Sequence, residues 1–573
     1  MSQQQIVIAV ILIAGSVISL VLTALKRRRL RGQRLIADFG QPPNPKEFDE
    51  DTLPHIKEYW RLMRAEDHQD SQVDDITWGD LDMDALFIRI NKTMSNAGEA
   101  VLYAMLRETG ESEDTLRRRD HWMRALTAEE TPRAGLQARL RKLGKSHFHS
   151  AYYFLRNPSG KTPEHAWFYL LLGVLPFLFL ALGFVHPAFF LGIAASFAVN
   201  LYIFYKTNAI WESEVMAIRH LSGVLHTGKG LLKHPVPGME EGFHRLDKLC
   251  KALSPIRRWN ALFAMTKVNH ADFLTDYLRI AFMLDMICLT RLAAFITRHQ
   301  EEVKELYHLV GEMDALISLA SLRKSLPQYC VPAFHEEKTV RAVDAAHPLI
   351  REPVTNSVHW TRNLLITGSN ASGKSTFTKA IALNAILAQT IMTCYASAFT
   401  LPRAQVMSSM AVRDQIQDGE SYFVVEIKSL RRILSAIREE RFLLCFIDEI
   451  LRGTNTIERI ASSAALLSYL NNQPVLCMAA THDIELTQLL SDYQQFHFRE
   501  EMTENGMVFP YRLMDGPSTT RNAIRLLEQM DFPETVTQRA DNLAARFTDT
   551  GSWDNNLTQI PLEQSAAKEK HHV

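Results

Sequence analysis

Three stretches of the sequence carry no charged residue and are long enough to cross a lipid bilayer. The first is Ile6 to Leu25; the other two, Ala166 to Val185 and Ala188 to Tyr205, are separated only by His186 and Pro187. A helix rises about 1.5 Å per residue, so about 20 residues span the roughly 30 Å hydrocarbon core of a bilayer. The pattern therefore predicts an N-terminal transmembrane anchor and, later in the chain, a transmembrane hairpin.

Basic residues beside these runs predict how the chain crosses the membrane. Six Lys or Arg residues lie between Lys26 and Arg34, after the first run, whereas a secretory signal peptide has its basic residues before the apolar run. Lys161 and Lys206 flank the hairpin. Because cytoplasmic flanks are rich in Lys and Arg, we expect a multi-pass protein of the inner (cytoplasmic) membrane, with everything after Lys206 in the cytoplasm. The alternatives are a cleaved signal peptide for the first run and a buried helical pair for the other two.

The rest of the chain shows two further patterns. From Trp78 to about Ser150, and from about Asn208 to Leu326, apolar residues recur every three to four positions, which indicates helices. Beyond Pro327, short β-rich runs alternate with helical stretches, as in a parallel α/β sheet. These β-rich runs are Asn363 to Ile366, Phe442 to Ile447 and Val475 to Ala479. We therefore predict a multidomain fold of the α and α/β classes.

Its length and these changes of pattern divide the chain into segments. A chain of 573 residues is too long for one ordinary domain. The expected segments are a transmembrane anchor with its basic flank (1–34), a Pro- and charge-rich juxtamembrane linker (35–75), the first part of a helical core (76–165), the transmembrane hairpin (166–205), the second part of that core with its levers (206–330), an α/β domain (331–548) and a polar tail (549–573).

Composition and charge narrow the function classes. The 63 Lys plus Arg against 64 Asp plus Glu give a net charge of -1, so any nucleic-acid-binding surface has to be local. Local basic runs occur at 117–119 and 139–142, although such runs are more often solvated helix faces. The six cysteines form no CxxC pair and show no zinc spacing with histidines. We expect reduced thiols in a cytosolic domain and no metal site built from cysteine.

Residues 368–375 match the phosphate-binding pattern GxxxxGK[ST] in full. The match follows an apolar strand and precedes a helix, which is the context that this loop requires. Its glycines let backbone N–H groups face phosphate oxygens, and the helix N-terminus adds positive potential. Lys374 is expected at the β- and γ-phosphates and the Ser375 hydroxyl at Mg²⁺. The expected ATP-binding residues are Gly368, Ser369, Asn370, Ala371, Ser372, Gly373, Lys374, Ser375 and Thr376.

Two carboxylates and a histidine follow the other two predicted strands. Asp448 and Glu449 come directly after Ile447, and His482 follows the run that ends at Ala479. Open parallel sheets place their ligands at the carboxyl ends of the strands. Asp448 is therefore a candidate outer-sphere Mg²⁺ ligand, Glu449 a candidate for polarising the attacking water, and His482 a candidate γ-phosphate contact. Solvated acids and a structural histidine are the alternatives.

Together these motifs resemble the ATPase domain of MutS-family mismatch-repair proteins. The resemblance covers about Thr77 to Ala545 and is strong in the ATPase part and weak in the helical part. Residues 418–426 look like the signature loop of the family, and residues 75–93, with Gly98, resemble the start of its helical core. The ATPase segments that carry the resemblance are 346–349, 368–376, 448–456 and 480–486.

The resemblance implies an ABC-type P-loop ATPase that works as a homodimer through its ATPase domains. Ser421 in the signature loop would contact the γ-phosphate bound by the other subunit. Residues 452–456 would couple the nucleotide to the dimer contact. We therefore expect a membrane-anchored ATP hydrolase that uses ATP and Mg²⁺, and in which dimer closure moves the helical levers and the hairpin.

The sequence also departs from the family pattern. Val354 stands where well-known members carry an aromatic residue under the adenine. Only Phe48 to Glu50 matches the mismatch-reading wedge of the family, within the predicted linker, and the hairpin falls near where other members insert a DNA-gripping clamp. Mismatch specificity is therefore not expected, while DNA stays open as a partner beside an unidentified membrane partner. The alternative functions are a membrane-tethered, DNA-binding mismatch-repair type protein and the motor of a membrane transporter.

Overall fold

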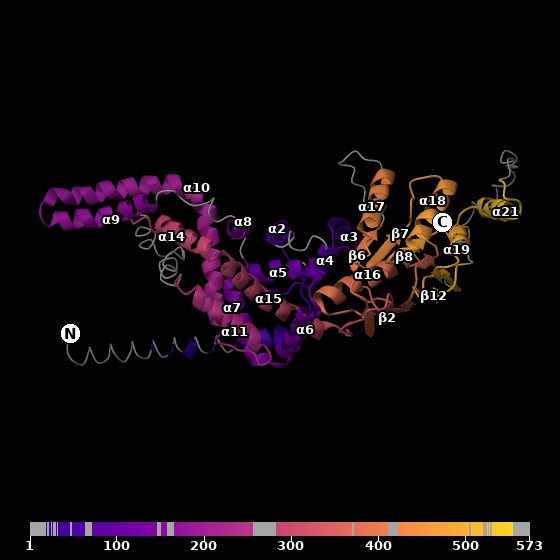
Figure 1. Cartoon of the computed structure of the whole chain (residues 1–573), viewed down its shortest axis with the longest axis horizontal. Coiled ribbons are helices and arrows are strands. Elements are labelled where there is room, and N and C mark those ends of the chain that lie inside the picture. The colour runs from indigo at the N-terminus through magenta and orange to yellow at the C-terminus, as the bar shows by residue number, and fades with distance from the viewer. Residues whose placement is uncertain are drawn as a thin grey trace, which may run out of the picture.

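The computed structural model describes residues 32–45, 48–63, 71–145, 151–156, 166–255, 282–369, 372–410, 422–439, 441–503, 506–518 and 530–553, with isolated positions between them. The molecule is elongated: a helical hairpin forms one end, an α/β domain the other, and a helical block lies between them (Figure 1). Most of the predicted anchor and most of the polar tail lie outside the described residues.

The helical block is built around one buried helix, α15 (Gln300–Ser325). It packs against α5, α6, α10 and α11, and its residues from Leu309 to Arg323 are all buried. Side-chain caps start several of the surrounding helices, as Asp74, Ser95 and Ser112 do for α3, α5 and α6. The other helices are α2 (Leu53–Met63), α3 (Asp75–Asp80), α4 (Met83–Ile90), α5 (Asn96–Arg107), α6 (Glu113–Ala128), α7 (Glu130–Leu143), α8 (Ala151–Arg156), α11 (Glu240–Ala252) and α14 (Leu284–Arg298).

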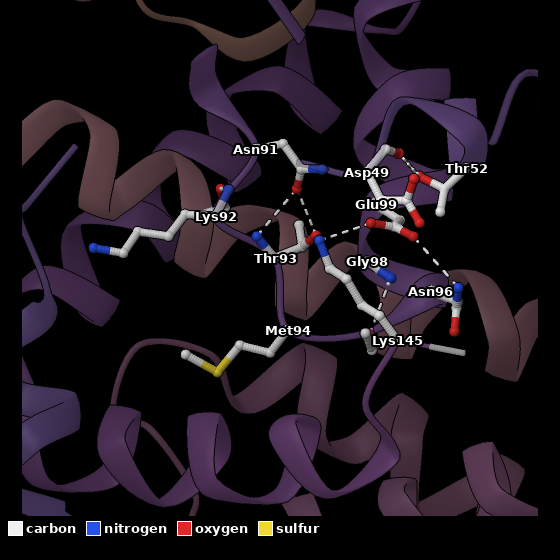
Figure 2. A network of polar contacts seen from close by, with 12 residues as sticks. Asp49, Thr52, Asn91, Lys92, Thr93, Met94, Asn96, Gly98, Glu99 and Lys145 are labelled. Carbon is white, nitrogen blue, oxygen red and sulfur yellow. Dashed lines mark hydrogen bonds and ion pairs between the residues drawn. The ribbon is translucent and has the colours of Figure 1, made fainter. Parts of the chain in front are cut away.

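A buried polar loop joins α4 to α5 and fixes both on α15. The Asp314 carboxylate on α15 accepts hydrogen bonds from the Met94 N–H at 3.0 Å and from the Ser95 hydroxyl at 2.6 Å. Burial raises the pKa of Asp314 to about 6. Gly98 lies so close that a Cβ there would stand 2.2 Å from this carboxylate. Figure 2 shows neighbouring contacts of the same loop, among them Thr93 with Asn91 and Glu99 with Asn96 and Lys145.

The predicted linker over residues 35–75 is wrong for the part of it that the structure describes. Ile56, Tyr59 and Trp60 on α2 are buried against the helical block, and Phe39 stacks under the guanidinium of Arg133 at 3.6 Å. The reason is visible in α2 itself, where apolar residues recur at helical spacing among charges. The prolines and charged residues of this segment favoured the prediction of a linker, although α2 is an amphipathic helix.

The predicted hairpin is present as two helices. They are α9 (Ala166–Gly183) and α10 (Phe190–Leu231), joined by the short 3-10 helix η3 (Pro187–Phe189), and the amide of Asn200 donates to the Leu172 carbonyl at 3.0 Å. Among the residues that the structure describes, one helix, Pro187–Thr207, could cross a membrane by length and composition, and Trp167–Gly183 is a shorter apolar helix. The expected boundary at residue 206 is not a break, because α10 continues for 42 residues into the helical block.

The α/β domain holds a six-stranded sheet of order β12-β9-β4-β8-β7-β6, parallel except for β12. All three predicted strands are present, as β4 (Leu364–Thr367), β7 (Leu443–Asp448) and β8 (Val475–Thr481). A second sheet has the order β1-β5-β2-β3. The remaining elements are β1 (Ala333–Phe334), β2 (Val340–Ala345), β3 (Asn356–Trp360), β5 (Ala398–Leu401), β6 (Gln405–Ser409), β9 (Gln494–His497), β10 (Glu501–Thr503), β11 (Gly506–Val508), β12 (Met514–Asp515), α16 (Lys374–Ile391), α17 (Tyr422–Ala436), α18 (Thr456–Leu470), α19 (Glu485–Leu489) and α21 (Glu534–Thr550).

Alternating side chains of the six-stranded sheet enter two different cores. Leu364 and Ile366 face α16, in a core that is continuous with the helical block. Leu365 faces the opposite side, which α17, α18 and α19 cover. The sheet is therefore joined to the helical block through α16, and its carboxyl strand ends are left to form a site.

Candidate functional site

The P-loop connects β4 to α16, as the sequence predicts. Gly368 and Gly373 have φ angles of 144° and 110°, in the region that favours glycine. A Cβ on Gly368 would lie 2.5 Å from the carbonyl oxygen of Phe498. Asn370 and Ala371 lie outside the described residues, while Ser369, Ser372, Lys374, Ser375 and Thr376 are described at the loop and at the start of α16.

Lys374 is a buried cation at the first position of α16. Its Nζ donates to the carbonyl oxygens of Gly368 at 2.9 Å and Ser369 at 2.8 Å, and lies 3.3 Å from Nδ1 of His482. Burial lowers the pKa of Lys374 to about 8, although nearby carboxylates act in the opposite direction. The ammonium group thus stands inside the loop whose backbone suits phosphate.

Asp448 ends β7 beside the first turn of α16. It forms a side-chain hydrogen bond with Ser375, and burial raises its pKa. Its Oδ1 is buried and has no hydrogen-bond partner among the described residues. The described residues contain no cluster of three or more His, Cys, Asp or Glu side chains that could hold a metal ion on its own. Asp448 and Ser375 nevertheless suit Mg²⁺, because this ion keeps water and phosphate oxygens among its ligands.

Glu449 is held by three neighbours in a left-handed backbone conformation, with φ of 55°. Its Oε1 lies 2.5 Å from Nε2 of His482, its Oε2 lies 2.7 Å from Arg452, and its N–H donates to the Ala480 carbonyl at 2.9 Å. The hydrogen bond with His482 is the main reason that the pKa of Glu449 is lowered. The carboxylate is therefore ionised and oriented at the strand ends, where it could accept a proton from water.

A cavity of about 500 Å³ opens beside these groups. Its lining includes Lys374, Ser375 and Glu449, together with His347 and Val354. Val354 is 43% exposed, so it offers an apolar surface but no ring. Burial lowers the pKa of His347 to about 4, which keeps its imidazole neutral at pH 7.

Tyr511, which no sequence motif singled out, also lines this cavity with an aromatic side chain. Asn356 fixes its segment: the Asn356 amide donates to the Tyr511 carbonyl at 3.0 Å and accepts from the Leu513 N–H at 2.8 Å. The Tyr511 ring also stacks with Phe509, with centroids 6.1 Å apart. An aromatic residue after β11 was visible in the sequence, but nothing local connects it with the P-loop.

Ser421 and residues 418–420 of the predicted signature loop lie outside the described residues, so the structure does not place the expected trans contact. The described part begins with α17, at Tyr422. The loop after Glu449 lies against this helix, since a Cβ on Gly453 would come within 3.0 Å of the Phe423 Cβ. This contact between the two motifs was not predicted from the sequence.

The basic run at 117–119 on α6 makes ion pairs within the protein. Arg117 pairs with Glu113 at 2.5 Å, Arg118 with Glu241 at 3.8 Å and Arg119 with Glu312 at 2.9 Å. Arg119 is also fully buried. Arg119 therefore serves the helical block, while Arg117 forms an exposed pair within its own helix, and each of the three arginines faces a carboxylate.

Comparison with known proteins places the α/β domain in a family. Residues 364–548 match the family model of MutS domain V. The chain is 29% identical to the DNA mismatch repair protein MutS of Oceanobacillus iheyensis, over 46% of this chain and 31% of that protein. It is 26% identical to that of Staphylococcus aureus (54% and 38%) and 30% identical to that of Thermus caldophilus (44% and 33%). The chain spans about a third of the length of these relatives. By this domain and these similarities, the chain is a MutS-family protein.

Proposed function

We propose that the chain is a membrane-anchored, MutS-like ATPase that hydrolyses ATP as a dimer and thereby moves its helical levers. One observation carries the proposal: Lys374, Asp448, Glu449 and His482 meet at the carboxyl ends of β4, β7 and β8, beside a cavity of about 500 Å³. Each of these side chains has the type and position that phosphoryl transfer to water needs.

The residues divide the work between binding and proton transfer. The P-loop backbone and Lys374 would hold the β- and γ-phosphates, exchanging the carbonyl contacts of the lysine for phosphate oxygens. Mg²⁺ would be held through Ser375 and Asp448 and would neutralise charge on the phosphates. Glu449 would orient the attacking water and accept its proton, while His482 keeps the carboxylate in place.

The part of the cavity that Tyr511 and Val354 line would receive the base. Tyr511 presents a ring beside Gly373 of the loop, and Val354 presents an aliphatic surface. A purine between the two could stack on one side and make apolar contact on the other. Tyr511 would therefore take over the stacking that the sequence analysis could not assign to Val354.

The dimer and the membrane are separate parts of the proposal. The resemblance suggests that Ser421 completes the ATP site of a second copy of the chain. Exposed apolar side chains on α9 and α10, such as Phe177 and Leu191, favour a bilayer around the hairpin. The unbroken α10 offers a rigid link from there to the helical block. Movement of the levers would thus reach the hairpin.

Glu449→Gln tests the catalytic assignment in the full chain, purified in nanodiscs. The amide cannot accept the proton of the attacking water, so we expect ATP binding to persist while turnover falls at least about 100-fold. Nucleotide retained after gel filtration and the rate of phosphate release measure the two effects. Lys248→Ala, an exposed position on α11, is the control. Unchanged turnover by Glu449→Gln would contradict the proposal.

The names of the relatives support a second candidate function. They are DNA mismatch repair proteins, so this chain could act on DNA from the membrane. Against it, the basic run on α6 is occupied by ion pairs. Binding of mismatched and paired duplex distinguishes the two candidates.

A further inference from the structure

Helix α17 supplies a carboxylate to the loop that follows Glu449. The side chain of Glu426, buried on α17, accepts hydrogen bonds from the backbone N–H groups of Leu451, Arg452 and Gly453. The Leu451 contact is the shortest of these, and that to Arg452 measures 3.3 Å. Successive N–H groups that converge on one anion form a binding nest.

The loop has a conformation that requires such support. Glu449 and Leu451 have φ angles of 55° and 58°. Residues other than glycine rarely adopt this left-handed backbone conformation. It persists where contacts with the surrounding structure stabilise it. The carboxylate of Glu426 satisfies donors on this turn that would otherwise lose their acceptor. The conformation that aims Glu449 at His482 is thus held from α17.

Helix α17 is itself fixed at its other end. Arg432 donates to the carboxylate of Asp74 and to the carbonyl oxygen of Ser408. The hydroxyl of Ser408 in turn donates to Asp80 at 2.7 Å. Asp74 and Asp80 belong to the start and end of α3, in the helical block, so Glu426 stands on a helix with a firm base.

We propose that Glu426 is a positioning residue for Glu449, acting through the strained turn between Glu449 and Gly453. The inference rests on the proposed function, because it assumes that Glu449 acts on water. It adds a residue that touches neither nucleotide nor water and yet sets the rate. Since α17 directly follows the segment expected to reach the second subunit, this contact would also connect that segment with the catalytic carboxylate of its own subunit.

Glu426→Ala removes the acceptor and Glu426→Gln keeps the shape of the side chain with one carbonyl oxygen. Misplacement of a reacting group by about 1 Å costs up to about 100-fold in rate, so we expect kcat to fall about 10- to 100-fold in Glu426→Ala and about threefold in Glu426→Gln. Nucleotide affinity and KM should stay within about twofold of the wild type, because the P-loop is untouched. Arg431→Ala, an exposed position on the same helix, should behave as the wild type.

A double variant shows whether Glu426 acts through Glu449. If it does, Glu426→Ala should not lower the residual rate of Glu449→Gln further, because the group that it positions is already disabled. An equal loss in both backgrounds would overturn the inference, as would wild-type kcat in Glu426→Ala. If the wild type were no faster than Lys374→Ala, the proposed function would fail and the inference with it, so the two failures are distinguishable. Loss of folding in Glu426→Ala leaves Glu426→Gln to decide the matter.

Discussion

In water, apolar side chains are usually buried and charged side chains exposed, and the two ends of the molecule depart from this rule in opposite ways. At the hairpin end of the molecule (Figure 1), apolar side chains are exposed, and the exposed fraction is 82% for Phe184 and 75% for Leu191. In the α/β domain, at the other end, charged side chains are buried, with Lys374 4% and Asp448 9% exposed. One end shows apolar atoms to the outside, and the other withdraws charges from water.

This difference indicates what each end binds. Apolar surface left in water forgoes about 25 cal/mol per Å², which a bilayer would supply at the hairpin. A buried charge costs several kcal/mol unless it is paired, which phosphate and Mg²⁺ would offset at the strand ends. In the helical block a buried charge is neutralised within the protein, since Glu312 is buried but paired with Arg119 at 2.9 Å. Buried charges and exposed apolar side chains that the protein itself does not compensate point to a ligand.

The largest effect is expected from Lys374→Ala. The buried ammonium group is the positive charge of the loop, and its removal takes away a cation that opposes the charge of both Asp448 and Glu449. We expect ATP hydrolysis to fall about 1000-fold, the upper end of the loss when one charge-stabilising group is removed. Steady-state phosphate release measures it, with Lys248→Ala as the control. A variant that kept a tenth of the rate would show that these charges are buried for another reason.

The same comparison predicts a position-dependent effect of arginine in the hairpin. Val174 on α9 and Val508 on β11 are similarly exposed, at 55% and 48%, but lie at opposite ends of the molecule. An arginine at the centre of a membrane helix costs about 2.5 to 3.5 kcal/mol, which is about 70- to 400-fold in the insertion equilibrium. Val174→Arg should therefore disfavour insertion and Val508→Arg should not.

Insertion can be read from a cysteine at the hairpin turn. In a His186→Cys background, an impermeant thiol reagent added to intact cells should label the turn from outside, and Val174→Arg should reduce the labelled fraction. Equal labelling with Val174→Arg and Val508→Arg would mean that the exposed face of α9 does not meet lipid. Labelling only after the cells are opened would reverse the expected topology.

The sequence predicted three strands of the six-stranded sheet, β4, β7 and β8, to within two residues, and the loop after β4, because their signals are local. An apolar run, a glycine loop and a carboxylate after a strand each lie within a few positions, and parallel topology brings the strand ends together. Tyr511 and Glu426 could not be predicted in the same way. Their roles depend on contacts with the P-loop and with Leu451, which are distant in sequence.

The helical part was predicted less well for a different reason. Charges and prolines around α2 masked the helical spacing of Ile56 and Trp60, so a packed helix was taken for a linker. At residue 206 the composition changes abruptly while α10 does not end. The composition of a helix reflects whether it lies in lipid or in a water-soluble domain. Its continuity depends on its backbone hydrogen bonds, which form in either environment.

A moderate effect is expected from pH, because burial lowers the pKa of Lys374 to about 8. Above that pH the free enzyme increasingly carries a neutral amine, and phosphate binding has to take up a proton. ATP affinity should therefore be nearly constant from pH 7 to 8 and then fall about tenfold per pH unit. Fluorescent-nucleotide titrations measure this. Lys374→Arg should lose the dependence, because a guanidinium group stays protonated across this pH range. Equal wild-type affinities at pH 7 and 9 would contradict the prediction.

The smallest effect is expected from a mismatch in DNA. Discrimination needs a side chain inserted at the flawed base step and a clamp that holds the bent duplex. The one candidate wedge is occupied: the Phe48 ring packs on Phe87 with centroids 6.0 Å apart, and Asp49 caps the 3-10 helix η2 (Glu50–Thr52). Phosphate contacts alone are sequence-blind.

We therefore expect a single-mismatch duplex and its paired counterpart to compete equally for the full-length protein at about 150 mM salt, near physiological ionic strength. Both should bind weakly, and more weakly still as salt rises. A tenfold preference for the mismatch, about 1.4 kcal/mol, would contradict this expectation. It would mean that the chain carries a third ligand-binding surface, one that recognises mismatched DNA, in addition to those at its two ends. Equal competition would leave the nucleotide and the bilayer as the two components that the buried charges and the exposed apolar side chains require.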